Sequence, residues 1–156
     1  MKLKELKEGY AKLSKKYNLP DFKKLNEAFE IDRIERDTDN VLREIRKTMM
    51  DKIIGYIRFV EMLINPAQAP PIFMIFVKEI SVRDRGVFEN VYKNLIELEL
   101  SSLKLEIDYS EVGEAETIKN IFQTWDNLKP DLRSVLDIMK KNLNSSPSKK
   151  EKGYFG

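Results

Sequence analysis

The chain has 156 residues, a net charge of +2, and neither a cysteine nor a histidine. The missing cysteines exclude disulfides, zinc–thiolate sites and iron–sulfur clusters, and the missing histidines exclude the usual serine triad and imidazole metal ligands. Charged residues make up 35% and hydrophobic residues 42% of the sequence, which is typical of one domain of long, solvated helices. The small net charge implies neither a nucleic acid nor a membrane as partner.

Residues 2–17 are predicted to form a helix with a narrow apolar stripe. The stripe recurs every three or four residues and consists of Leu3, Leu6, Tyr10, Leu13 and Tyr17. A stripe this narrow suits packing along one neighbouring helix. Pro20 is expected to begin a short second helix, with Asp21 near its positive end. The apolar side of that helix is formed by Phe22, Leu25 and Phe29.

Residues 41–64 form the strongest predicted helix and the expected centre of the core. Thr38, Asp39 or Asn40 is expected to cap its N-terminus. A helix that is apolar over most of its circumference belongs in the middle of a bundle. Its main stripe consists of Leu42, Ile45, Met49, Ile53, Tyr56, Val60 and Leu63.

Two interpretations are open for residues 72–109. Residues 72–77 are a continuous apolar run, which a buried strand and a buried helix share. Residues 103–109 alternate between apolar and polar, so a short β-hairpin of residues 72–82 with 103–109 is one alternative. Helix is preferred, because the intervening apolar residues keep helical spacing and because Leu, Glu and Lys favour helix. These residues are Phe88, Val91, Tyr92, Leu95 and Leu98.

Residues 111–143 are the last predicted helix, and its apolar register continues across Pro130. A single kinked helix is therefore favoured over two helices joined by a loop. After Asn144 the composition changes to Ser, Pro, Lys and Gly, so residues 1–144 are predicted to be a helical bundle domain and 145–156 a disordered tail. The tail ends in Tyr154 and Phe155, which are hypothesised to bind a protein partner.

The expected fold is all-α. It is a compact bundle of four to six helices around the central helix 41–64, with at most the one β-hairpin described above. No internal repeat is evident in the sequence.

Carboxylates are the only plausible metal ligands in this composition. Glu27 with Glu30, and Glu111 with Glu114, have the i,i+3 spacing with which helical phosphohydrolases hold Mg²⁺. A second pair is expected from the central helix, whose acidic residues are too far apart to form one: Glu44, Asp51 and Glu61. A solvated acidic face is therefore preferred. No metal site, cofactor or catalytic residue is predicted.

A lysine-rich N-terminal segment is the second candidate site. Lysines neutralise phosphates without reading base sequence, but residues 1–24 lack the arginine that makes bidentate contacts. A solvated helix face is the plainer interpretation. The candidate nucleic-acid-binding residues are Lys2, Lys12, Lys15, Lys16, Lys23 and Lys24.

A third charged group lies on the central helix, where Arg43, Arg46 and Lys47 follow one another closely. These residues are expected to pair with the acidic connector before the helix rather than to bind an anion. The acidic residues of that connector are Glu35, Asp37 and Asp39.

A non-enzymatic interaction module or scaffold is the leading functional interpretation, and it rests on these exclusions. The alternatives are a weak, sequence-independent nucleic-acid binder and, disfavoured, a Mg²⁺-dependent phosphohydrolase. The N-terminus lacks an apolar signal stretch and no run reaches the ~18 apolar residues of a membrane span, so a cytoplasmic location without membrane contact is expected. A protein partner is expected, and a homo-oligomer is left open.

Overall fold

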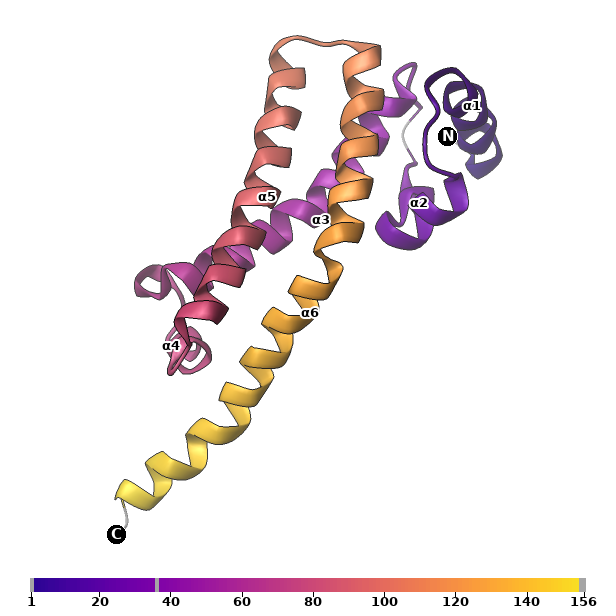
Figure 1. The fold of residues 1–156 in the computed structure, drawn as a ribbon. Coiled ribbons are helices and arrows are strands. Elements are labelled where there is room, and N and C mark those ends of the chain that lie inside the picture. The colour runs from indigo at the N-terminus through magenta and orange to yellow at the C-terminus, as the bar shows by residue number, and fades with distance from the viewer. Residues whose placement is uncertain (1, 36, 155–156) are drawn as a thin grey trace. The chain divides into compact units, whose positions relative to one another are not determined.

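The computed structural model describes the backbone of residues 2–35 and 37–154, with side chains up to Ser145. This part of the chain contains helices and no strand, which confirms the all-α prediction. The segments 72–77 and 82–107 are both helical, so the alternative β-hairpin of 72–82 with 103–109 is wrong. The described helices (Figure 1) are α1 (Leu3–Tyr17), α2 (Phe22–Phe29), α3 (Val41–Ile64), α4 (Ile72–Val77), α5 (Val82–Ile107) and α6 (Glu111–Tyr154).

The chain divides into two compact units, and each unit is built from two stretches of sequence. Unit 1 contains Met1–Gly55 and Leu95–Asp126, and unit 2 contains Tyr56–Asn94 and Asn127–Gly156. Helices α1 and α2 therefore belong to unit 1 and α4 belongs to unit 2, while α3, α5 and α6 supply residues to both.

The start of α2 differs from the prediction. Asp21 is the N-cap, and its side chain accepts a hydrogen bond from the backbone N–H of Lys23 at 3.2 Å. Pro20 was expected to open this helix, but it lies before the cap. Its carbonyl instead accepts a 2.6 Å hydrogen bond from the hydroxyl of Tyr10, a buried residue of α1. This contact joins α1 to the turn that follows it.

The core of unit 1 lies around the first half of α3, where the predicted stripe is buried. Phe29 of α2 packs against Trp125 of α6 with ring centroids 5.9 Å apart. Lys52 of α3 places its Nζ 4.9 Å from the Trp125 ring and donates a 2.6 Å hydrogen bond to the carbonyl of Ala28. The buried stripe residues of α3 in this unit are Leu42, Ile45, Met49 and Ile53.

Unit 2 is held together by a small aromatic cluster and by α6. Phe73 of α4 packs edge-to-face against Phe59 and Phe76, at 6.1 and 5.5 Å. The side-chain amide of Asn142 donates a 2.7 Å hydrogen bond to the carbonyl of Phe76, which ties the end of α4 to α6. The buried apolar residues of this unit include Val60, Leu63, Phe88, Val91, Leu132, Val135 and Met139.

Helix α6 is continuous through Pro130, which confirms one helix rather than two. Its backbone also continues past Asn144 to Tyr154, where the sequence predicted a separate disordered tail. The separation of residues 1–144 from a tail of residues 145–156 stays a prediction. The side chain of Tyr154 and all of Phe155 lie outside the described residues, and partner binding there stays a prediction.

Within the described range, no helix combines the length and the apolar character that crossing a membrane requires.

Candidate functional site

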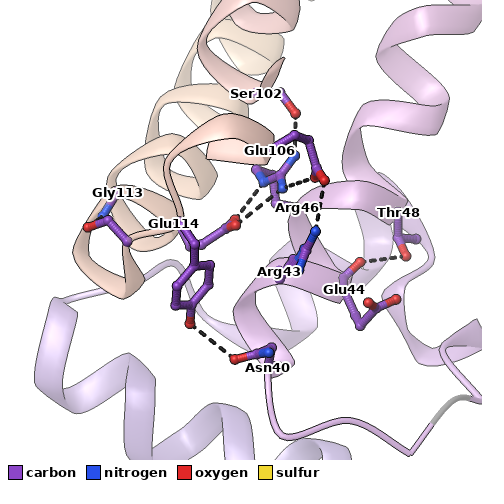
Figure 2. A network of polar contacts seen from close by, with 11 residues as sticks. Asn40, Arg43, Glu44, Arg46, Thr48, Ser102, Glu106, Gly113 and Glu114 are labelled. Carbon is purple, nitrogen blue, oxygen red and sulfur yellow. Dashed lines mark hydrogen bonds and ion pairs between the residues drawn. The ribbon is translucent and has the colours of Figure 1, made fainter. Parts of the chain in front are cut away.

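A buried polar network in unit 1 joins α3, α5 and α6 around Arg46 (Figure 2). The side chain of Arg46 is on α3 and that of Glu114 is on α6, and the two residues are only 1% and 0% exposed. Arg46 Nε donates to Glu114 Oε2 at 2.5 Å, and Arg46 Nη2 donates to Glu114 Oε1 at 3.2 Å. The contact is therefore bidentate, the arrangement in which a guanidinium binds a carboxylate most strongly.

The remaining donors of Arg46 bind α5. Its Nη2 donates to Glu106 Oε1 at 2.5 Å, and its Nη1 donates to the hydroxyl of Ser102. Arg43 completes the network by donating to Glu106 Oε2 at 2.8 Å. Hydrogen bonds from Arg46 and then Arg43 lower the pKa of Glu106 to about 2. Two arginines thus face two glutamates, and their charges cancel.

The partners of these arginines differ from the prediction. Arg43 and Arg46 were expected to pair with the connector residues Glu35, Asp37 and Asp39, but they bind α5 and α6 instead. The reason is burial. The Arg46 guanidinium lies in the interior of unit 1, and an unpaired charge there would carry a desolvation penalty of several kcal/mol. Glu114, which is buried beside Arg46, and Glu106, which is partly exposed, together offset that penalty.

The acidic pair Glu111 and Glu114 is occupied by other contacts. Glu114 binds Arg46, while Glu111 Oε1 accepts a 2.9 Å hydrogen bond from Lys16 Nζ and another from the hydroxyl of Tyr17. The bonds from Tyr17 and then Lys16 lower the pKa of Glu111. The two carboxylates therefore serve different helix contacts and do not face a common point.

In the other acidic pair, Glu27 and Glu30, only Glu30 forms an ion pair within the described residues. Glu30 forms a 2.8 Å ion pair with Arg33, and Glu27 is exposed on α2. Across the described residues, no three acidic side chains come close enough together to hold a metal ion.

The candidate nucleic-acid-binding lysines divide between two helices. Lys2, Lys12, Lys15 and Lys16 belong to α1 or its cap, whereas Lys23 and Lys24 belong to α2, and all six are exposed. Lys16 is already bound to Glu111. Tyr10 is buried, so its ring is not free to stack on a base. Nucleic-acid binding by these lysines stays a prediction.

A cleft of about 560 Å³ opens beside the polar network in unit 1. Its walls carry both signs of charge. The basic residues include Arg33, Arg46 and Lys47, and the acidic residues include Glu35, Glu44 and Asp51. A phosphate site needs convergent cations and a metal site needs convergent carboxylates. This mixture fits neither ligand.

The outer face of α5 is the feature that the sequence did not predict. In unit 1, the second half of α5 and the start of α6 form an antiparallel hairpin (Figure 1). Leu100, Leu103 and Ile107 are 61%, 52% and 81% exposed there, although Leu95 and Leu98 on the same helix are buried. We name the row formed by these three residues and the half-buried Ile96 the α5 stripe, so it consists of Ile96, Leu100, Leu103 and Ile107.

The two apolar sides of α5 explain the strand-like pattern in the sequence. Leu103 and Ile107 belong to the exposed stripe, while Leu105 points toward the beginning of α6. A Cβ atom added at Gly113 would lie 2.7 Å from Leu105 Cδ2, which shows how closely the two helices approach there. The alternation of residues 103, 105 and 107 therefore arises from two helix faces and not from a strand.

No protein-family model, no curated protein and no solved structure matches this chain. Two arrangements in unit 1 remain as candidate functional features. The Arg46 network can fix three helices in place, and the α5 stripe can bind an apolar surface of another molecule.

Proposed function

We propose that this chain is a non-enzymatic interaction module that binds another protein chain through the α5 stripe. The observation that carries the proposal is that α5 is apolar on two sides and covered on only one. A helix that is apolar all round is normally buried, and contiguous exposed apolar side chains mark interaction sites. The second side of α5 is therefore suited to an intermolecular contact.

The size of the stripe indicates a reversible contact. Full burial of one Leu or Ile contributes roughly 1.5–3 kcal/mol, so the exposed parts of Leu100, Leu103 and Ile107 would contribute roughly 3–6 kcal/mol on docking. Association costs about 4–15 kcal/mol in lost freedom of motion. Binding therefore needs a partner with an apolar surface of similar size, and we expect it to be weak.

The polar network supports this role by holding the stripe in place. Arg46 contacts α5 through Ser102 and Glu106, and Ser102 directly precedes Leu103 of the stripe. Because these contacts fix α5 against α3 and α6 within unit 1, little ordering is required when a partner docks. A surface that is already ordered binds with a smaller entropic cost.

The experiment is a pull-down from native lysate with tagged full-length chains. The test variant is Leu100→Glu/Leu103→Glu, and the matched control is Leu136→Glu, an exposed leucine on α6 outside the stripe. Circular dichroism checks that all chains fold. We expect proteins that are retained by the wild type and by Leu136→Glu to be lost from the double variant. If all three chains retain the same proteins, the stripe is not the interaction surface.

A further inference from the structure

We propose that a second copy of this chain occupies the α5 stripe. In this homodimer the two α5 helices pack antiparallel, around a twofold axis that passes between Leu100 and Leu103. The inference rests on the proposed function, because it names the partner that the stripe binds. It follows from the order of apolar and charged residues along α5.

The apolar residues of the stripe are self-complementary on reversal. Their order is Ile, Leu, Leu, Ile with spacings of four, three and four residues, so the row reads the same in both directions. This spacing is the heptad pattern with which two helices pack along a common seam. In the antiparallel pair, Ile96 lies opposite Ile107 of the second copy, and Leu100 lies opposite Leu103 of the second copy.

The charges on one flank of the stripe favour the antiparallel direction. Within unit 1 this flank carries Glu97 and Lys104, and both side chains are exposed. On reversal, Glu97 lies beside Lys104 of the second copy. The twofold axis repeats this contact between opposite charges, so it occurs twice.

The other flank carries Glu99 and Glu106, which approach each other across the antiparallel pair. This like-charge contact is relieved within each copy, because Glu106 is bound to Arg46 at 2.5 Å and to Arg43 at 2.8 Å. The two arginines neutralise the carboxylate and hold it against its own unit. The buried network thus removes the main electrostatic objection to self-pairing.

The seam is short, and the dimer is correspondingly weak. From Ile96 to Ile107 the helix rises roughly 17 Å, which is about three turns. Two-helix seams of this length bury less area than a standard stable interface. We therefore expect a concentration-dependent equilibrium between monomer and dimer rather than a permanent dimer.

The test is sedimentation equilibrium of the full chain and two charge-reversal variants, Glu97→Lys and Lys104→Glu. Each variant alone places like charges together across the seam and should self-associate about tenfold more weakly than the wild type. An equal mixture of the two variants restores opposite charges at both positions. The mixture should therefore form dimers at least as well as the wild type.

Matched controls separate this pairing from general charge attraction. Asp137→Lys and Lys140→Glu change the net charge by the same amounts at exposed positions of α6, and they should associate like the wild type alone and mixed. Glu97→Lys associating as well as the wild type would exclude the antiparallel arrangement, because a parallel pair does not bring Glu97 beside Lys104. A mixture no better than its components would also overturn the proposal.

A wild-type chain that stays monomeric at every concentration would overturn self-pairing as well. The proposed function would then be judged separately by the pull-down. If the Leu100→Glu/Leu103→Glu chain still loses proteins that the wild type retains, the stripe binds a different partner. If the pull-down is also unchanged, both the partner and the surface are wrong.

Discussion

Arg46 Nε and Glu114 Oε2 lie 2.5 Å apart inside unit 1, although the two residues are separated by 68 positions in the sequence. Neither side chain has appreciable contact with solvent. A buried ion pair contributes little net stability compared with an apolar pair of the same shape, but removal of one partner leaves the other charge buried and unpaired. The pair is therefore a sensitive position for mutation.

Replacement of Arg46 by Met is expected to lower the free energy of unfolding by about 3–5 kcal/mol, because it leaves the buried carboxylate of Glu114 without its ion-pair partner. Arg43→Met serves as the control, since Arg43 is partly exposed and its loss should cost about 1 kcal/mol or less. Urea denaturation measures both values. The double variant Arg46→Met/Glu114→Leu should recover part of the loss. Equal destabilisation by Arg46→Met and Arg43→Met would contradict this account.

Acid should destabilise the chain through Glu106. The pKa of this residue is lowered from 4.5 to about 2 by hydrogen bonds from Arg46 and Arg43. A folded-state pKa below the unfolded value stabilises the fold above pH 4.5, and that stabilisation is lost as the pH falls toward 2. The Glu106→Gln variant cannot titrate at this position, so its unfolding free energy should fall less steeply across the same window. Identical pH profiles for the two chains would argue against this assignment.

The two sides of α5 should respond differently to the same substitution. Leu98→Ala removes a buried side chain and is expected to cost about 2–5 kcal/mol. Leu100→Ala lies in the exposed stripe and is expected to change the unfolding free energy by about 0.5 kcal/mol or less. The measurement is chemical denaturation at low chain concentration, where self-association does not contribute. If Leu100→Ala lowered the unfolding free energy by clearly more than about 0.5 kcal/mol, the stripe would be buried in the folded chain and not exposed.

The hydroxyl of Tyr10 is expected to stabilise unit 1. Tyr10→Phe removes the 2.6 Å hydrogen bond to the carbonyl of Pro20 and should cost about 0.5–1.5 kcal/mol. Tyr109→Phe is the control, because its hydroxyl donates to Asn40 Oδ1 in an exposed contact and its loss should be close to neutral. Thermal unfolding of the two variants compares them directly. The same melting temperature for both would mean that the buried bond has no net effect.

The helices were predictable wherever one side of a segment carries apolar residues at regular spacing. The row of Leu42, Ile45, Met49 and Ile53 indicated α3 and its buried side, and the structure confirms both. Periodicity of this kind reflects the burial of one face, and it needs no knowledge of the neighbouring helices. The continuity of α6 through Pro130 was predicted on the same basis.

Neither candidate functional feature of unit 1 was predictable in this way. The partners of Arg46 lie far away in the sequence, and periodicity does not show which helices face each other. The α5 stripe could not be predicted from the sequence for a different reason. Because Leu103 and Leu105 lie on opposite sides of α5, the apolar residues show no single face, and only the exposed fractions reveal which side is uncovered.

The discontinuous path of unit 1 also determines when it can fold during synthesis. Met1–Gly55 leaves the ribosome first, but Leu95–Asp126 is needed to complete the same unit. Until then, Phe29 has no Trp125 to pack against and Tyr17 has no Glu111 to bind. Contacts between such distant segments slow folding and leave apolar surface open in the interval, which is the interval in which chaperones act. Unit 1 can therefore be completed only after residues 56–94, which belong to unit 2, have been synthesised.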